Sequence, residues 1–154
     1  MVCKDENYTK EIAYLKEKID AGADMIITQL FFDSKVFNTF VKDCRNIGIK
    51  VPIIPGIMCI KSFEGFKRMI DFCKTRVPKN IYDLLSNANN TINNSEESIK
   101  DSSDKVKKIG IKIIEDMCRE LLNNNCPGLH FYTLNQSSIT LEICANLRKD
   151  NLIR

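Results

Sequence analysis

Three short apolar segments alternate with longer segments of helical periodicity, and this alternation leaves few folds open to the chain. The apolar segments are residues 25–28, 51–54 and 129–133. Between them, apolar side chains recur every three or four residues, as in Phe37, Phe40 and Cys44. Short buried strands separated by amphipathic helices indicate right-handed βαβ units and a parallel sheet. The sequence therefore predicts an α/β fold.

The expected helices have recognisable start and stop signals. Asp33 and Ser62 are good N-cap residues for two of them. The expected helical segments are residues 9–20, 34–47, 63–73, a short turn near 79–85, a long helix from about 105, and 138–147. Pro55-Gly56 is expected to stop the second strand, because this dipeptide marks turns.

Residues 86–104 have a different composition from the rest of the chain. They read "SNANNTINNSEESIKDSSD", which is rich in Asn and Ser and nearly free of large apolar side chains. Such a segment buries too little surface to offset the entropy lost on ordering. We therefore expect a disordered, low-complexity insert there.

Composition excludes several classes of protein. The chain has 154 residues, which fits one domain or part of a larger one. Its net charge of +3, without basic clusters among aromatics, argues against nucleic-acid binding. No apolar run approaches the ~20 residues of a membrane span, and the first ten residues do not resemble a signal peptide. The seven cysteines lack the spacing of a zinc site. We expect a cytoplasmic protein with reduced thiols and no metal.

Polar or conformationally special residues follow each expected strand. Thr28-Gln29 follows the first, Pro55-Gly56 the second, and Asn135 lies just past the third. In parallel α/β folds, ligands bind at the carboxyl ends of the strands. Gln29 is therefore either a core amide paired to the backbone or a ligand contact. Strand alternation places it on the same face as Ile27, so if Ile27 points inward Gln29 does too, at the carboxyl end of the strand.

Four motifs in this order resemble methylenetetrahydrofolate reductases: "YLKEKIDAGAD", "AGADMIITQLFFD", "VPIIPGIM" and "PGLHFYTLN". The resemblance implies a (β/α)8 TIM barrel that binds FAD. It also implies reduction of 5,10-methylenetetrahydrofolate to 5-methyltetrahydrofolate, with NADH or NADPH as reductant. Residues 1–154 would be the C-terminal half of one catalytic barrel, with strands six, seven and eight and their helices.

The resemblance also implies roles for individual residues. It assigns four residues to the folate pocket: Gln29, Tyr132, Leu134 and Asn135. It assigns three residues to the outer part of FAD: Lys18, Tyr14 and Glu11. The family's acidic groups lie on the early strands, so we assign no catalytic residue to this chain. His130, the single histidine, is expected to pack or pair locally.

Three interpretations remain open at this stage. The chain is the C-terminal part of a reductase, inactive alone, whose partners are the folate substrate and a missing N-terminal half-barrel or a second copy. Alternatively, it is a non-catalytic remnant that binds a folate or pairs with another half-barrel. The third interpretation is structural degeneration without function.

Overall fold

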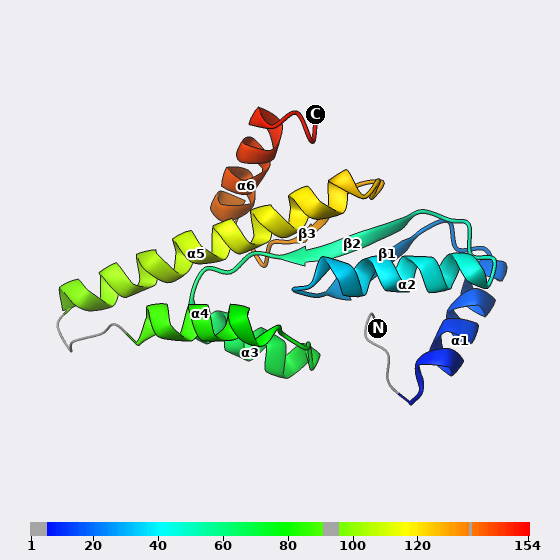
Figure 1. Ribbon diagram of the computed structural model, residues 1–154, viewed down its shortest axis with the longest axis horizontal. Coiled ribbons are helices and arrows are strands. Elements are labelled where there is room, and N and C mark those ends of the chain that lie inside the picture. The colour runs from blue at the N-terminus through cyan, green and yellow to red at the C-terminus, as the bar shows by residue number, and fades with distance from the viewer. Residues whose placement is uncertain (1–5, 91–95, 136) are drawn as a thin grey trace.

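The structure is a computed structural model of the chain that describes residues 6–90, 96–135 and 137–154. The elements are α1 (Tyr8–Asp20), β1 (Ile26–Leu30), α2 (Ser34–Asn46), β2 (Ile53–Met58), α3 (Phe63–Cys73), α4 (Lys79–Asn89), α5 (Glu96–Asn123), β3 (His130–Tyr132) and α6 (Ser137–Lys149). Helices separate the three strands, and three helices, α3, α4 and α5, follow one another between β2 and β3 (Figure 1).

The described strands form one open sheet in the order β1-β2-β3. Both pairs are parallel, which confirms the α/β prediction. β1 and β3 are the two edges of this sheet. A parallel three-stranded sheet with free edges is consistent with part of a barrel, because a complete barrel has no edge strand.

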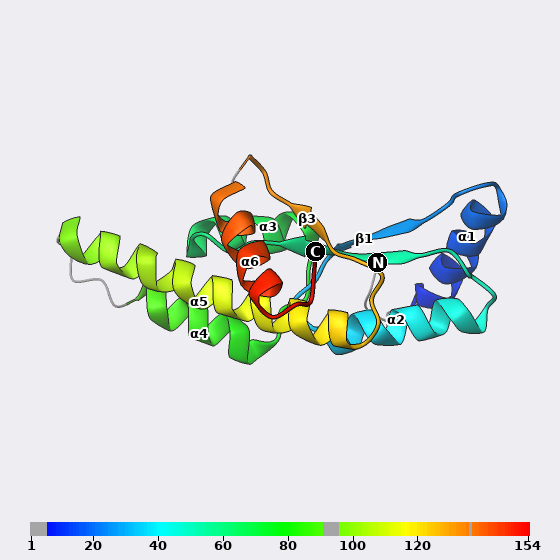
Figure 2. The ribbon, with the colours of Figure 1, turned by 90° about the horizontal axis from the view of Figure 1, so that it is seen from above.

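Helices cover one face of the sheet and leave the other face more exposed. Helices α2, α4 and α5 lie on the same side of the strands (Figure 2). Along β1, Ile26 and Leu30 are buried whereas Ile27 is 45% exposed and Gln29 is exposed. The alternation follows from the two-residue period of a strand, so Ile27 and Gln29 share the open face.

Two helix starts are as the sequence predicts. The Asp33 carboxylate accepts a hydrogen bond from the Lys35 N–H at 2.9 Å, at the start of α2. The Ser62 hydroxyl oxygen accepts one from the Gly65 N–H at 3.2 Å, at the start of α3. Both contacts pair N–H groups that the first helical turn leaves without a partner.

The expectation that Pro55-Gly56 stops the second strand is wrong. β2 begins at Ile53 and continues through both residues to Met58. Proline interrupts a ladder by lacking an N–H, but it does not force a turn where the neighbouring contacts hold the chain extended. The break falls in the pairing instead, because the register between β1 and β2 shifts between Ile27 and Leu30.

The expected disorder of residues 86–104 is not found where the structure describes this segment. α4 continues to Asn89, and α5 begins at Glu96 instead of near residue 105. The two helices pack side by side. Ser102 is 2% exposed, and its hydroxyl donates to the Asn89 carbonyl at 3.5 Å. A small polar side chain thus fits the contact between the two helices, for which the prediction required large apolar residues. Residues 91–95 lie outside the described ranges.

α5 crosses the segment after β2 at a glycine. A Cβ atom at Gly110 would lie 2.6 Å from the Ile60 carbonyl oxygen and 2.7 Å from its Cβ atom. The two backbones can approach this closely only because glycine has no side chain. Towards its C-terminal end, α5 buries Ile114, Cys118 and Leu121 completely.

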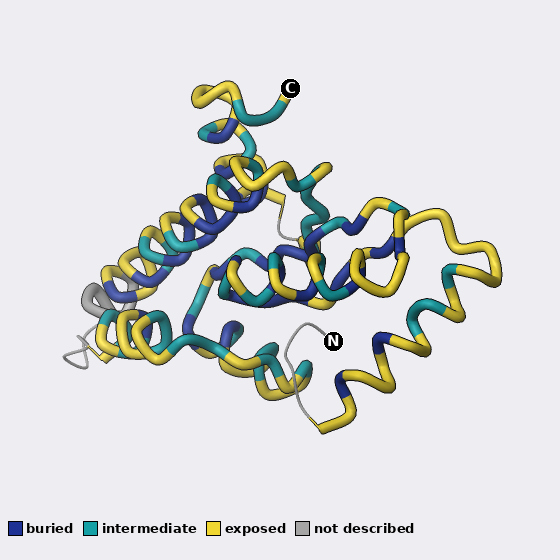
Figure 3. The backbone as a smooth tube through the Cα atoms, turned by 45° about the vertical axis from the view of Figure 1, so that its right-hand side comes forward, coloured by how far each residue is buried: buried dark blue, intermediate teal, exposed yellow. Residues whose placement is uncertain are grey.

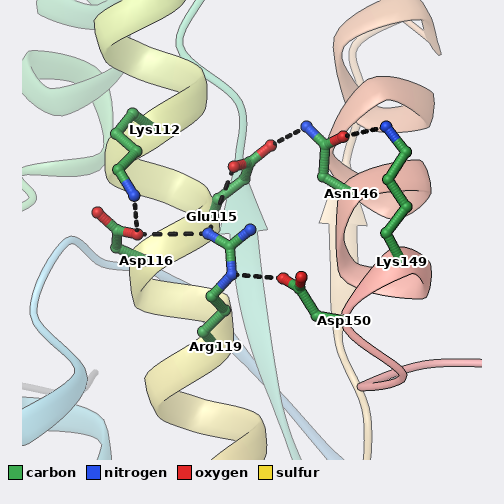
Figure 4. A network of polar contacts seen from close by, with 7 residues as sticks. All are labelled: Lys112, Glu115, Asp116, Arg119, Asn146, Lys149 and Asp150. Carbon is green, nitrogen blue, oxygen red and sulfur yellow. Dashed lines mark hydrogen bonds and ion pairs between the residues drawn. The ribbon is translucent and has the colours of Figure 1, made fainter.

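A polar network joins α5 to α6 (Figure 4). The Arg119 guanidinium donates to Asp150 at 2.7 Å and also contacts Glu115 at 3.4 Å. Glu115 is only 6% exposed and also accepts a hydrogen bond from the Asn146 amide. Because these partners satisfy a buried carboxylate, the network fixes how α6 lies against α5.

Candidate functional site

A cavity of about 430 Å³ lies between α1 and the edge strand β1. We call it the α1–β1 cavity. Its lining includes four residues that the resemblance assigns to ligands, which are Glu11, Tyr14, Lys18 and Gln29. Three come from α1 and one from β1. The fold therefore brings together four of the seven candidate residues. The resemblance assigns Gln29 to the folate and the other three to FAD.

Gln29 lies at the carboxyl end of β1 with its side chain exposed. Its Oε1 atom accepts a hydrogen bond from the Leu30 backbone N–H at 3.0 Å. Gln29 is therefore exposed in the described structure, although its amide is paired to the backbone as the core-amide interpretation expects. The contact uses the carbonyl oxygen of the amide, and a glutamine amide also carries two N–H donors. The amide is thus fixed through its Oε1 atom where it lines the cavity.

The α1 wall of the cavity carries a positive charge above an aromatic ring. The Lys18 ammonium lies 4.4 Å from the centroid of the Tyr14 ring. Tyr14 is 58% exposed and lines the cavity. This cation–π contact orients the ammonium without neutralising it. Glu11, in the first turn of the same helix, adds a carboxylate acceptor.

The residues assigned from the third strand line a different and smaller cavity. Tyr132 and Leu134 face Gly65, Phe66 and Met69 around about 80 Å³. Met69 and Phe66 come from α3 and make the apolar wall. This volume admits little more than the edge of a ring.

Asn135 is exposed just past Leu134 and is not among the residues that line either cavity. Both residues have left-handed backbones, with φ of 48° for Leu134 and 62° for Asn135. The described structure therefore does not bring Asn135 to Gln29. Residues with such backbones often lie at functional turns.

Tyr132 connects the two cavities. Its hydroxyl donates to the Thr28 carbonyl oxygen at 2.9 Å, which spans from β3 across β2 to β1. Sequence reasoning placed Thr28 and Gly56 at the strand ends but missed their contacts with Tyr132. The available signal was Pro55-Gly56 inside an apolar run, which indicates a ladder break as well as a turn.

The remaining chemistry-bearing residues of the described structure offer no metal centre or activated nucleophile. Its His, Cys, Asp and Glu side chains form no group suited to a metal ion. Burial raises the pKa of Cys118 to about 12 and also raises the pKa of Cys59. A protonated thiol is a poor nucleophile. His130 packs edge-on against the Tyr132 ring, with centroids 4.8 Å apart.

No helix of the described ranges is long and apolar enough to cross a bilayer.

Comparison with known proteins gives consistent matches. A family model described as methylenetetrahydrofolate reductase matches residues 1–148. The chain is 47% identical over 142 residues to "Probable methylenetetrahydrofolate reductase (NADH)" of Oryza sativa subsp. japonica. It is 32% identical over 137 residues to "5,10-methylenetetrahydrofolate reductase" of Escherichia coli (strain K12). These matches cover 92% and 89% of this chain, but 22% and 43% of the two relatives. The chain thus spans about a fifth of the length of the plant relative.

A solved structure also resembles the fold. It is titled "Uncharacterized protein from Clostridium thermocellum binds two copies of 5-methyl-5,6,7,8-tetrahydrofolic acid". The TM-score is 0.52 at 21% sequence identity, and the match covers 94% of this chain and 48% of that chain. At this identity the match shows the fold alone.

Proposed function

The chain belongs to the methylenetetrahydrofolate reductase family, and we propose from this that it supplies part of the folate- and FAD-binding site of such an enzyme. In this proposal its three strands are strands six to eight of a (β/α)8 barrel. The proposed activity of the complete protein is reduction of 5,10-methylenetetrahydrofolate to 5-methyltetrahydrofolate with NADH or NADPH. The chain alone is proposed to bind ligand without turnover.

One observation carries the proposal. The α1–β1 cavity gathers Glu11, Tyr14, Lys18 and Gln29 around about 430 Å³, a volume typical of small-molecule sites. Its lining runs along β1 from Ile26 to Gln29, which lies near the carboxyl end of the strand, where parallel α/β folds place their ligands. A cation, an aromatic ring, a carboxylate and an amide at that place suit a charged ligand with heteroaromatic rings.

Gln29 is proposed to bind the pterin ring of the folate. An amide presents an acceptor and two donors in one plane, which matches the alternating donors and acceptors along a pterin edge. Tyr132 and Leu134, beside the apolar wall from Phe66 and Met69, are proposed to support the same ligand from the β3 side. Asn135 is proposed to contact the folate or the nicotinamide from the exposed turn after β3.

The α1 wall fits the outer part of FAD. The Lys18 ammonium suits a diphosphate, and its place over the Tyr14 ring leaves its charge unneutralised by that contact. Glu11 can accept hydrogen bonds from ribose hydroxyls. FAD, when bound, would supply the hydride that the folate receives.

The proposal predicts that two variants lose different ligands. Gln29→Ala should weaken binding of 5-methyltetrahydrofolate by roughly tenfold or more, since a ligand hydrogen bond to a polar group is lost, and should keep FAD binding. Lys18→Ala should weaken FAD binding and keep folate binding. Calorimetric titration of the whole chain with each ligand measures both effects.

Lys16→Ala is the matched control, because Lys16 lies on the same helix but forms an i, i+4 pair with Asp20. It should bind both ligands like the wild-type chain. Loss of both ligands in both variants would show a structural role for these residues instead. Absence of binding of either ligand by the wild-type chain would overturn the proposal.

A non-catalytic folate-binding protein is the second candidate. It is favoured because the residues that line the two cavities suit binding, and the described thiols whose pKa values are raised by burial are not nucleophiles. NADH or NADPH oxidation by the chain combined with an N-terminal half-barrel of the family and loaded with FAD distinguishes the two, because neither candidate turns over as the chain alone. Steady oxidation would identify a reductase, and ligand binding with no oxidation would favour the binding protein.

A further inference from the structure

The pairing between β1 and β2 contains a break that side chains repair. Ile27 pairs with Ile54 and Leu30 pairs with Gly56, so two residues of β1 lie opposite the single residue Pro55. Proline has no N–H to donate to the neighbouring strand. The break therefore falls at Thr28 and Gln29, the residue pair that carries the proposed pterin contact.

Thr28 replaces the missing ladder contact. Its hydroxyl oxygen accepts a hydrogen bond from the Gly56 N–H at 3.0 Å and donates its own proton to the Gln29 carbonyl oxygen at 3.0 Å. Thr28 is 5% exposed, and its contact with the Gly56 N–H is buried, whereas the contact with the Gln29 carbonyl is partly buried. The threonine side chain thus takes over a pairing that a regular strand makes with its backbone.

Tyr132 completes the repair from the far strand. Its hydroxyl donates to the Thr28 carbonyl oxygen at 2.9 Å. To reach that atom, the ring passes over β2 at Gly56, where a Cβ atom would lie 2.6 Å from the Tyr132 ring and 2.2 Å from the Thr28 carbonyl oxygen. Any side chain at position 56 would displace either the ring or the strand, so the tyrosine contact depends on this glycine.

A strand irregularity of this kind sets the direction of the side chain that it carries. Gln29 is exposed, and its side chain accepts the Leu30 N–H within the same irregular stretch. Its orientation is therefore inherited from the backbone of residues 28–30. That backbone is held from β2 through the Thr28 hydroxyl and from β3 through the Tyr132 hydroxyl.

We propose that Thr28, Gly56 and Tyr132 act as positioning residues for Gln29, with the Tyr132 hydroxyl as the remote anchor. In this arrangement the phenol serves the site by fixing the strand that presents the amide. The consequence for a folate ligand rests on the proposed function, whereas the positioning itself concerns the unliganded chain.

The test measures amide hydrogen exchange by NMR in the wild-type chain and in Tyr132→Phe. The Leu30 amide reports the orientation of Gln29, because that side chain is its acceptor. The Gly56 amide reports the Thr28 hydroxyl. Loss of the phenolic hydroxyl should raise exchange at both amides by roughly two- to twelvefold, the factor that corresponds to one net hydrogen bond. Amides of α5 should exchange as in the wild-type chain.

Two sets of variants separate positioning from general destabilisation. Tyr82→Phe removes a phenolic hydroxyl from α4, where the ring packs against Phe63, and should leave Leu30 and Gly56 unchanged. Thr28→Val removes the repairing hydroxyl at nearly constant shape and should raise exchange at Gly56. Thr28→Ser keeps the hydroxyl and should restore most of the protection.

Titration with 5-methyltetrahydrofolate gives the second readout. Tyr132→Phe and Thr28→Val should each weaken binding by a factor similar to their exchange change, with Tyr82→Phe as control. The effect of Thr28→Val separates positioning from the direct ligand contact proposed for Tyr132, because Thr28 has no proposed contact with the folate. If Tyr132→Phe alters exchange but the wild-type chain binds no folate, the positioning proposal stands and the proposed function is overturned. Unchanged exchange at Leu30 and Gly56 in Tyr132→Phe, or unchanged folate affinity in a chain that binds folate, would overturn the positioning.

Discussion

Helices α6 and α1 are held against the rest of the molecule by different kinds of contact. α6 buries Ile143 and Leu147 completely and is joined to α5 by the Arg119 network. α1 buries Tyr8 and Ile12 but keeps the α1–β1 cavity between itself and the sheet. Most of its surface is exposed (Figure 3).

This difference relates packing to the proposed site. Three of the candidate ligand residues, Glu11, Tyr14 and Lys18, lie on the sparsely packed helix. Ligand-binding elements are commonly drawn from the less stable parts of a protein, because a ligand then supplies contacts that the fold lacks. A well-packed α1 would fill the cavity with its own side chains.

The largest expected difference between the two helices is in core truncation. Leu147→Ala should lower the free energy of unfolding by about 2–5 kcal/mol, since the side chain is fully buried. Ile12→Ala should cost less, about 1–2 kcal/mol, because α1 can open locally before the rest unfolds. Urea denaturation of both variants measures this. Equal losses of unfolding free energy in the two variants would show that α1 is held as firmly as α6.

Cys118, a buried thiol of α5, should make the stability of the protein depend on pH. Burial raises the pKa of Cys118 from 9.0 to about 12 and that of Cys44 to about 11. An unfolded thiol therefore loses its proton above pH 9 while the folded one keeps it. Stability present below pH 9 should fall between pH 9 and 12, by at most ~1.4 kcal/mol per pH unit for each thiol.

Cys118→Ala should flatten this fall most strongly between pH 11 and 12, where Cys44 has already titrated. Denaturation midpoints over that range give the measurement. An unaltered slope in the variant would assign the pH dependence to other groups.

Loss of a single polar contact should lower stability less than core truncation does, and the effect should differ between α6 and α1. Arg119→Ala should cost about 1–2 kcal/mol of global stability, because the nearly buried Glu115 loses a charged partner. Lys112→Ala is its control on the same helix, since Lys112 is 68% exposed and pairs with Asp116 on the surface.

Tyr8→Phe removes the hydrogen bond from the Tyr8 hydroxyl to Asp43, which joins α1 to α2 at 2.9 Å. We expect a loss of about 1 kcal/mol that appears as faster amide exchange within α1, while the global midpoint stays nearly constant. A shifted midpoint with unchanged α1 exchange would mean that α1 opens together with the rest of the molecule.

The smallest effect is expected at Lys16. Its i, i+4 pair with Asp20 is exposed, and such pairs contribute about 0.5 kcal/mol or less. Lys16→Ala should therefore unfold at nearly the wild-type urea concentration. A larger loss would show that the outer face of α1 makes contacts beyond this pair.

Local signals predicted much of the fold. Asp33 and Ser62 start helices where their side-chain chemistry indicated, and the period of β1 gives Ile27 and Gln29 one shared face. The contact between Tyr132 and Thr28 could not be read in this way. It depends on a strand register and on a partner 104 residues away, neither of which leaves a local pattern.

The described parts of residues 86–104 show the limit of composition as a guide to disorder. Asn and Ser are poor core residues, yet Ser102 of α5 is 2% exposed and its hydroxyl donates to the Asn89 carbonyl at the end of α4. Large side chains at one position and small ones at the next can make a tight helix pair. Counting large apolar residues alone therefore missed the beginning of α5.

The close approach at Gly110 has a consequence for the sequence variation that this fold tolerates. With the Ile60 carbonyl 2.6 Å from any added Cβ, even alanine at this position would push α5 away from the segment that follows β2. Gly128 has no atom within 4 Å of such a Cβ and should accept many residues. In a library of variants selected for folded chains, glycine should therefore be retained almost always at position 110, whereas many residues should be found at position 128.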